Sequence, residues 1–193
     1  MTPTYVAFAD MTCVARGNLL EVALQLKARY QQSPCAPATI FEDKTSRIVD
    51  VWLEGTDQQI KDWILAHLPE ALPAEHNRPR GRPKLGVVGR EVTLLPRQWD
   101  WLHQQPGGAS VTLRKLIDQA AKDPQTEQRR AQDATYRFCT AVAGDAVGFE
   151  EALRALYAGQ ENLFTSLIQR WPSDVAEHAN TLARPIWQSL PNT

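Results

Sequence analysis

The stretch TYVAFADM, residues 4–11, alternates β-forming and small residues, and TCVARG (12–17) follows it directly. This pattern predicts a strand and its hairpin partner. The next segment, NLLEVALQLKARYQQ (18–32), begins with Asn18, a residue favoured at helix N-caps, and its apolar residues recur at helical spacing. A hairpin that leads straight into an amphipathic helix indicates an α+β fold.

The residues that follow extend this N-terminal unit. ATIFED (38–43) and SRIVDVWLEG (46–55) are rich in β-formers, and a polar turn at Lys44 to Ser46 joins them. TDQQIKDWILAHL (56–68) begins with Thr56, a second candidate N-cap, and carries an apolar stripe. Residues 1–69 are therefore predicted to form a small ββαββα-like unit.

The rest of the chain divides into three segments. Residues 70–89 are rich in proline, lack periodicity and are predicted to be a linker. Residues 90–124 predict a strand–helix–helix element, with REVTLL (90–95) as the strand and a first helix that begins at Pro96. Ser110 is the expected cap of its second helix, whose predicted buried face is Val111, Leu113, Leu116 and Ile117. Residues 125–193 predict helices at about 126–143, 148–158, 160–171 and 173–183.

Charge is unevenly distributed along a chain whose net charge is −1. Residues 1–77 hold 6 Lys/Arg and 10 Asp/Glu, and residues 131–193 hold 4 and 7. Residues 78–130 hold 11 Lys/Arg and 5 Asp/Glu, which leaves the centre with a charge of +6. Such a basic centre suggests a polyanionic partner, although a solvated linker that uses charge for solubility has the same composition.

Several functional classes find no support in the sequence. It has no nucleophile-elbow, phosphate-loop or dinucleotide-binding motif, and its four histidines show no metal-ligand spacing. We therefore expect neither an enzyme nor a cofactor or metal site. No run is apolar enough to span a bilayer, and three widely spaced cysteines fit reduced core thiols, so we expect no membrane partner and a cytoplasmic protein.

The basic centre contains PRGRP at residues 79–83, which resembles the core of the AT-hook, a short DNA-binding element. This resemblance implies that Arg80 and Arg82 enter A·T-rich minor groove, which is narrow and strongly negative. Gly81 would allow the backbone to approach closely, and the flanking Arg78 and Lys84 would contact phosphates. The alternative is that the stretch is a stiff, soluble tether.

The strand, proline-started helix and second helix of residues 90–124 resemble the ribbon-helix-helix DNA-binding proteins, which pair strands from two chains. That resemblance implies a homodimer. It makes Arg90 and Thr93 candidate base contacts and Ser110 a candidate phosphate contact, with further backbone contacts from Arg97, Arg114 and Lys115. However, the same register turns Glu91 toward the core, so either the register shifts by one or this is an ordinary element packed on the protein.

Two longer phrases of the sequence resemble a bacterial family of unassigned function. They are RGRPKLGVVGREVTLLPRQWDWLHQQPGGASVTLRKLID and YRFCTAVAGDAVGFEEALRALYAG. The favoured interpretation is a nucleoid-located DNA-binding protein, a transcriptional regulator or nucleoid-associated protein that prefers A·T-rich double-stranded DNA. The alternative is a non-enzymatic protein-interaction module, whose acidic N- and C-terminal parts contact a protein partner and whose basic stretch is only a tether.

Overall fold

The computed structural model describes residues 3–32, 36–72 and 88–188. The chain divides into two compact units, of which unit 1 comprises residues 1–74 and 127–193 and unit 2 comprises residues 75–126. Unit 1 holds a small antiparallel sheet and most of the helices, which confirms the α+β prediction. The N-terminal unit and the C-terminal helices, predicted as separate segments of sequence, thus belong to one compact unit.

The sheet is built around the first stretch of the sequence. Strand β1 (Tyr5–Ala9) lies in the middle, with β2 (Thr12–Gly17) and β3 (Thr39–Glu42) antiparallel on either side of it. The turn between β1 and β2 has only two residues, Asp10 and Met11, with φ angles of 47° and 63°. Positive φ at both central residues lets so tight a turn match the strand twist, and the predicted hairpin is confirmed.

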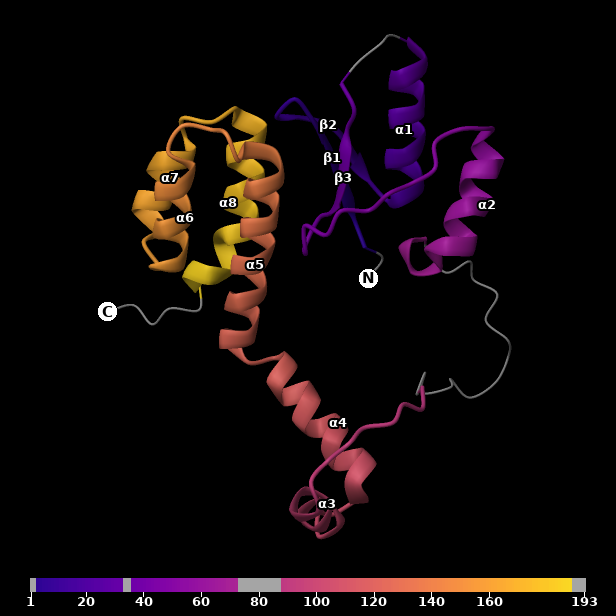
Figure 1. Cartoon of the computed structure of the whole chain (residues 1–193), viewed down its shortest axis with the longest axis vertical. Helices are drawn as coiled ribbons and strands as arrows, with labels where there is room; N and C mark the ends of the chain where they lie inside the picture. Colours follow the sequence, from indigo (N-terminus) through magenta and orange to yellow (C-terminus); the bar gives the residue numbers. More distant parts are fainter. Residues whose placement is uncertain (1–2, 33–35, 73–87, 189–193) are drawn as a thin grey trace. The chain divides into compact units, whose positions relative to one another are not determined.

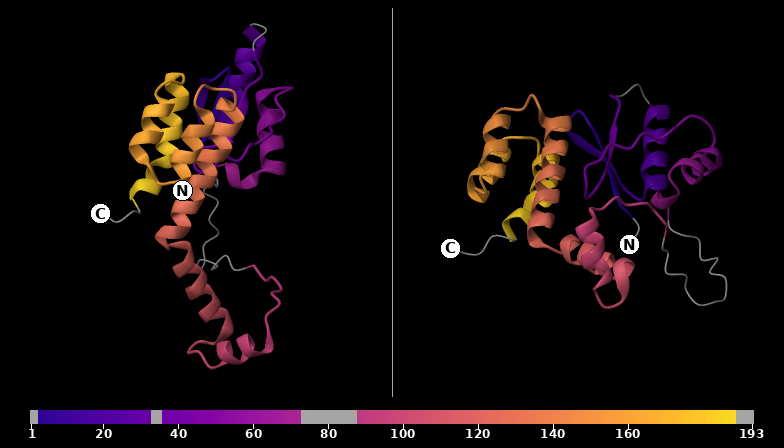
Figure 2. Two further views of the ribbon diagram at one scale, coloured as in Figure 1. Left: turned by 60° about the vertical axis from the view of Figure 1, so that its left-hand side comes forward. Right: turned by 60° about the horizontal axis from the view of Figure 1, so that its bottom comes forward.

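Every residue of β1 is buried because helices cover both faces of the sheet (Figures 1 and 2). Tyr5 and Ala7 face one core, which they share with α1 (Leu19–Gln32) and α2 (Asp57–His67). The alternate residues Val6 and Phe8 belong to the other core, with the C-terminal helices. Because successive side chains of a strand point to opposite faces of the sheet, β1 contributes to two hydrophobic cores.

Both predicted helix starts in this region are confirmed by reciprocal capping. The amide of Glu21 donates to Asn18 Oδ1 at 3.1 Å, while the amide of Asn18 donates to Glu21 Oε2 at 2.9 Å. Thr56 and Gln59 exchange the same pair of bonds at the start of α2. Each pair satisfies two amides that would otherwise lack a partner.

The second predicted hairpin forms only in part. The turn after β3 is present, but SRIVDVWLEG contributes a single bridge, between Phe41 and Ile48, instead of a strand. The last ladder bond joins the Val49 amide to the Ile40 carbonyl at 2.9 Å. The expected second strand of residues 46–55 was therefore wrong, because pairing ends after this bond.

The C-terminal part of unit 1 is helical, as predicted. Its helices are α5 (Pro124–Ala143), α6 (Phe149–Tyr157), α7 (Glu161–Ile168) and α8 (Ser173–Gln188). Their core includes Phe138, Leu156, Phe164 and Ile186, all fully buried. Helix α8 continues through Pro185 and is longer than the predicted 173–183. A short 3-10 turn (Pro69–Ala71) follows α2.

The described part of unit 2 consists of two helices, α3 (Pro96–His103) and α4 (Gly108–Ala121), which contact each other. Pro96 begins α3, as its fixed φ predicts. Residues 90–95 do not form the predicted strand. A strand requires a hydrogen-bonded neighbour, and no described segment of the single chain supplies one.

Candidate nucleic-acid interface

The candidate DNA-binding residues fall into two groups. Arg78, Arg80, Gly81, Arg82 and Lys84, the AT-hook-like group, lie outside the described residues. The second group belongs to the described part of unit 2, and all its members are exposed: Arg90, Thr93, Arg97, Ser110, Arg114 and Lys115. The side chains of this second group are therefore accessible to a partner.

The start of α4 differs from the prediction. Gly107, with a φ of 91°, occupies the N-cap position, and Ser110 lies within the first turn. A Cβ added at Gly107 would meet Val111 Cγ1 at 3.1 Å, so glycine fits both the backbone and the space. The prediction that Ser110 caps the helix was therefore wrong, although Ser110 remains at the end where free amides can bind an anion.

Arg114 is held next to Ser110 on α4. Its Nε donates to the Ser110 carbonyl at 3.1 Å, one helical turn earlier. Lys115 follows Arg114 on the same helix, whereas Arg97 lies in the first turn of α3. The structure thus places the cation of Arg114 beside the first turn of α4. The N-terminal end of a helix is partially positive, so this end favours a bound anion.

Unit 2 leaves much of its apolar surface exposed. Among its described residues, the buried ones are Leu102 in α3 and Thr112 in α4. The prediction that one face of α4 is buried was wrong for the single chain, because Leu116 and Ile117 are 43% and 63% exposed. Further large apolar side chains are also exposed: Val88, Val92, Leu95 and Trp101. So few buried residues give little hydrophobic stabilisation to a unit of this size.

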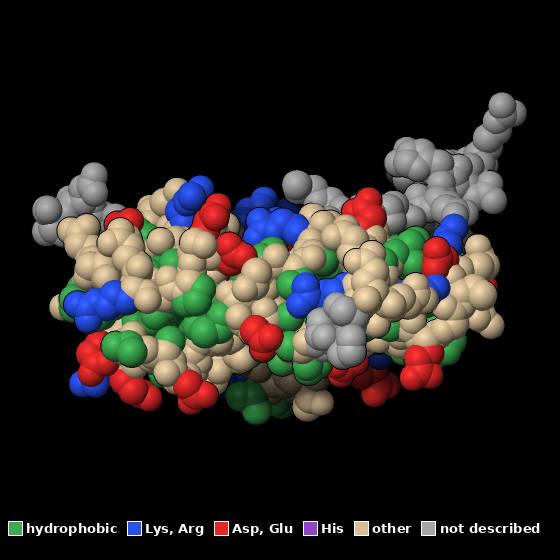
Figure 3. Space-filling view, turned by 90° about the horizontal axis from the view of Figure 1, so that it is seen from above, with side chains coloured by type: hydrophobic (Ala, Val, Ile, Leu, Met, Phe, Trp, Pro, Cys, Tyr) green, Lys and Arg blue, Asp and Glu red, His purple; other side chains and the backbone are tan. Residues whose placement is uncertain are grey.

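Charge in the described part of unit 2 is nearly balanced. Residues 88–126 hold five Lys/Arg and four Asp/Glu, so most of the central positive charge belongs to residues 78–87. The face of unit 1 that Figure 3 shows also carries Lys and Arg side chains interspersed with Asp and Glu. The strongest concentration of positive charge in the sequence therefore remains the AT-hook-like segment.

Unit 1 contains a buried polar cluster that the sequence interpretation missed. His178 of α8 is 2% exposed, and its Nδ1 lies 3.2 Å from Arg16 Nη2 and 3.8 Å from Asp43 Oδ1. A guanidinium only donates, so Nδ1 accepts and the ring hydrogen lies on Nε2. Within the described residues Nε2 has no hydrogen-bond partner, and the ring packs edge-to-face on Phe138 at 4.5 Å.

The surroundings of His178 favour its neutral form. Burial lowers its pKa to about 4, while the nearby Asp43 carboxylate raises it and Arg16 lowers it. A signal in the sequence could have revealed this burial, because His178 lies three residues after Val175 and four before Leu182, within the apolar stripe of α8. The cluster joins the sheet to α8, and the Cys13 amide adds a bond to Asp174 Oδ2 at 2.9 Å.

Of the two thiols in the described residues, Cys13 and Cys139, neither has a pKa lowered toward the nucleophilic thiolate form. Cys139 is fully buried, as expected for a core thiol, and burial raises its pKa to about 12. Burial also raises the pKa of the half-buried Cys13 thiol. Over residues 3–32, 36–72 and 88–188, no group of three or more His, Cys, Asp or Glu side chains could hold a metal ion. No helix of this part of the chain is long and apolar enough to cross a membrane.

These features define an α+β protein with a compact mixed unit and a smaller helical unit. Residues 4–183 match a family described as uncharacterized proteins conserved in bacteria (DUF2239), and the chain belongs to this family. Neither a search of curated proteins nor a search of solved structures finds a match. The family resemblance predicted from the longer phrases is thereby confirmed.

Proposed function

We propose that the protein binds A·T-rich double-stranded DNA, as a transcriptional regulator or nucleoid-associated protein. The observation that carries this proposal is PRGRP (79–83), in which two arginines flank a glycine between two prolines. Cations in the same part of the sequence raise the charge of residues 78–130 to +6 between acidic flanks. Such a concentration of positive charge attracts a polyanion such as DNA.

Each residue of the segment has a distinct role in this mechanism. Arg80 and Arg82 insert their guanidinium groups into the narrow minor groove, where the potential is most negative. Gly81 has no side chain to hold the backbone away from the groove floor. An A·T floor carries only acceptors, whereas guanine adds an amino group that blocks the groove. Arg78 and Lys84 contact phosphates and fix the register of the segment.

A second copy of the chain would complete unit 2. Residues 90–95 have no strand partner among the described residues, and Val92, Leu95 and Ile117 are each more than half exposed. Pairing two such segments would satisfy their backbone groups and bury these side chains together. In this dimer Arg90 and Thr93 contact bases, and the exposed cations of α3 and α4 contact the DNA backbone.

The proposal is tested by fluorescence anisotropy of labelled A·T-rich and G·C-rich duplexes at 50 and 200 mM salt. We expect the A·T-rich duplex to bind more tightly, and the Arg80→Ala/Arg82→Ala variant to lose this preference. Arg129→Ala/Arg130→Ala is the matched control, because it removes two exposed arginines of α5 outside the motif. If wild-type protein binds neither duplex at 50 mM salt, the proposal is wrong.

The competing function is a protein-interaction module in which residues 78–84 are a tether. Salt dependence separates the two, because releasing counterions from about four phosphates gives a slope of about −3 to −4 in log K against log salt. A contact made through apolar side chains has a far smaller slope. A protein contact made by unit 1 would be compatible with DNA binding by residues 78–84.

A further inference from the structure

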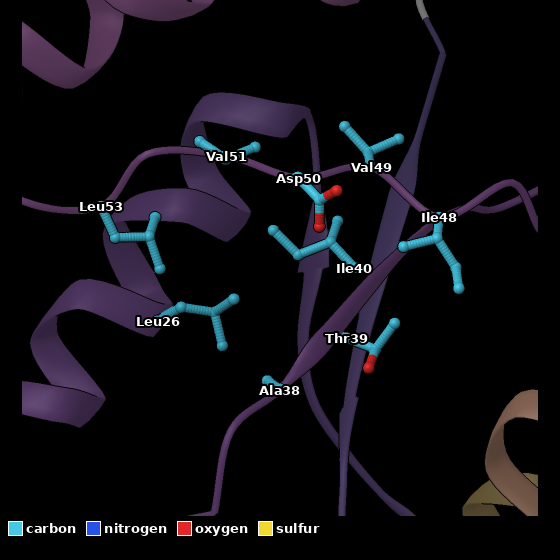
Figure 4. A pocket seen from close by; sticks show the side chains of 9 residues that line it. All are labelled: Leu26, Ala38, Thr39, Ile40, Ile48, Val49, Asp50, Val51 and Leu53. Carbon is cyan, nitrogen blue, oxygen red and sulfur yellow. The ribbon is translucent and has the colours of Figure 1, made fainter.

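Unit 1 contains a groove of about 290 Å³ beside the edge strand β3, lined by apolar side chains and by backbone (Figure 4). Leu26 of α1 and Ile40 of β3 form part of its wall. The remaining apolar side chains come from the irregular segment after the partial hairpin, namely Val49, Val51 and Leu53. A groove of this size accepts one large apolar side chain, and it is smaller than most pockets for drug-sized ligands.

On one side of the groove, the backbone makes no hydrogen bond to any other residue that the structure describes. The Val49 amide makes the last bond to β3, and no described residue bonds to the backbone of Asp50, Val51, Trp52 or Leu53. These residues therefore present free N–H and C=O groups beside an apolar surface. Unpaired backbone groups of this kind can form hydrogen bonds with an extended peptide, as the edge of a sheet does.

The segment on one side of the groove, residues 48–57, carries only acidic charged side chains. Asp50 and Glu54 are exposed carboxylates, and residues 48–57 contain no Lys or Arg. The third acid in this range, Asp57, is already paired with Lys27, at 2.6 Å between Oδ1 and Nζ. Two carboxylates thus remain available to a cation brought by a partner.

These charges argue against a second copy of the chain as the occupant. In a two-fold pairing of this segment with itself, Asp50 and Glu54 of one copy would approach the same acids of the other. Like charges on paired strands destabilise the pairing. A basic partner gains from the same two carboxylates.

We propose that this groove binds an extended peptide segment of another protein, in which an apolar side chain alternates with lysine or arginine. The apolar side chain enters the groove between Leu26 and Leu53, and the peptide backbone pairs with residues 50–53. The cation lies beside Asp50 and Glu54. Ile48, which is 57% exposed, extends the apolar contact at the other end of the segment.

The test uses the full ¹⁵N-labelled chain without DNA and an eight-residue peptide in which lysine alternates with leucine and valine. We expect amide chemical shifts to change at residues 48–54 and at Ile40, and to saturate at millimolar peptide. The same peptide with glutamate in place of lysine should bind at least fivefold more weakly. Because no DNA is present, the outcome is independent of the proposed DNA binding.

Charge-reversal variants identify the groove. Asp50→Lys should weaken binding of the lysine peptide at least fivefold. Asp145→Lys, which reverses an exposed carboxylate between α5 and α6, is the matched control and should bind like wild type. The proposal is overturned if residues 48–54 do not shift, if the shifts spread over the acidic surface, or if Asp50→Lys and Asp145→Lys behave alike.

Discussion

The buried His178 ring should make the folded protein sensitive to acid. In the folded chain the imidazole accepts a hydrogen bond from Arg16 and packs on Phe8 and Phe138. Protonation would place two cations, His178 and Arg16, side by side in the core, where the Asp43 carboxylate offsets them in part. Lowering the pH therefore perturbs one defined contact between the sheet and α8.

The size of the effect follows from two pKa values. The pKa of His178 is about 4 in the folded chain and 6.5 in its unperturbed state. Between these values the unfolded state binds a proton that the folded state excludes, so stability is full above pH 6.5 and decreases as the pH falls. The loss is about 2 kcal/mol at pH 5 and about 3 kcal/mol at pH 4, where the folded state begins to take up the proton.

The assay is urea unfolding followed by circular dichroism between pH 7 and pH 4.5, for wild type and His178→Asn. Asparagine keeps a side-chain acceptor but does not titrate, so its difference from wild type isolates the histidine from the carboxylates. We expect the stability advantage of wild type over His178→Asn to shrink by about 2 kcal/mol from pH 7 to pH 5. The matched control is His67→Asn, because His67 is exposed on α2.

One result would refute this reasoning. If wild type and His178→Asn lose stability in parallel from pH 7 to pH 5, His178 does not titrate with a lowered pKa. A change of the same size in His67→Asn would show that the effect does not depend on burial.

Three further variants test the packing, the helix cap and the proposed dimer. Phe138→Ala should cost about 3–5 kcal/mol in urea unfolding, because this fully buried ring contacts Phe8, Phe41 and His178; a loss below about 1 kcal/mol would contradict the described core. Thr56→Ala should cost about 1 kcal/mol by removing one bond of the cap of α2, and an unchanged urea midpoint would argue against that cap. Ile117→Lys should weaken self-association in analytical ultracentrifugation, because Ile117 is 63% exposed on the apolar face of unit 2; a wild-type chain that stays monomeric at high concentration would rule out the dimer.

Local signals in the sequence predicted much of unit 1. Alternation identified β1, and Asn18 and Thr56 marked helix starts that the structure confirms by reciprocal bonds. These signals act within a few residues, so they can be read from one segment at a time. Both faces of β1 are nevertheless buried, which no local pattern could reveal, because the second covering layer comes from residues more than 120 positions later.

The predictions that were wrong also failed because they depended on residues outside the local segment. SRIVDVWLEG has the composition of a strand, yet only Ile48 pairs, because pairing depends on the geometry of the neighbouring β3. Ser110 has the chemistry of a cap, but Gly107 adopts the left-handed conformation that starts α4 three residues earlier. The burial of His178 depends on Arg16 and Phe138, which approach it only in the folded chain.

The candidate interface was less predictable than the fold. The exposure of Arg90, Arg97 and Lys115 agrees with a role in binding DNA, but exposure is common for such side chains and does not identify a ligand. The face of α4 that was predicted to be buried carries Leu116 and Ile117, which are exposed in the single chain. A second copy or another partner would account for the pattern that predicted their burial.

The most direct test of DNA binding is the ratio of affinities for A·T-rich and G·C-rich duplexes, measured for wild type and Arg80→Lys/Arg82→Lys. This variant keeps the charge but replaces the planar guanidinium groups, so the salt dependence should persist. We predict that wild type prefers the A·T-rich duplex at least tenfold and that the variant loses most of this preference. Equal affinity of the wild-type protein for both duplexes would contradict recognition of A·T-rich minor groove by residues 78–84.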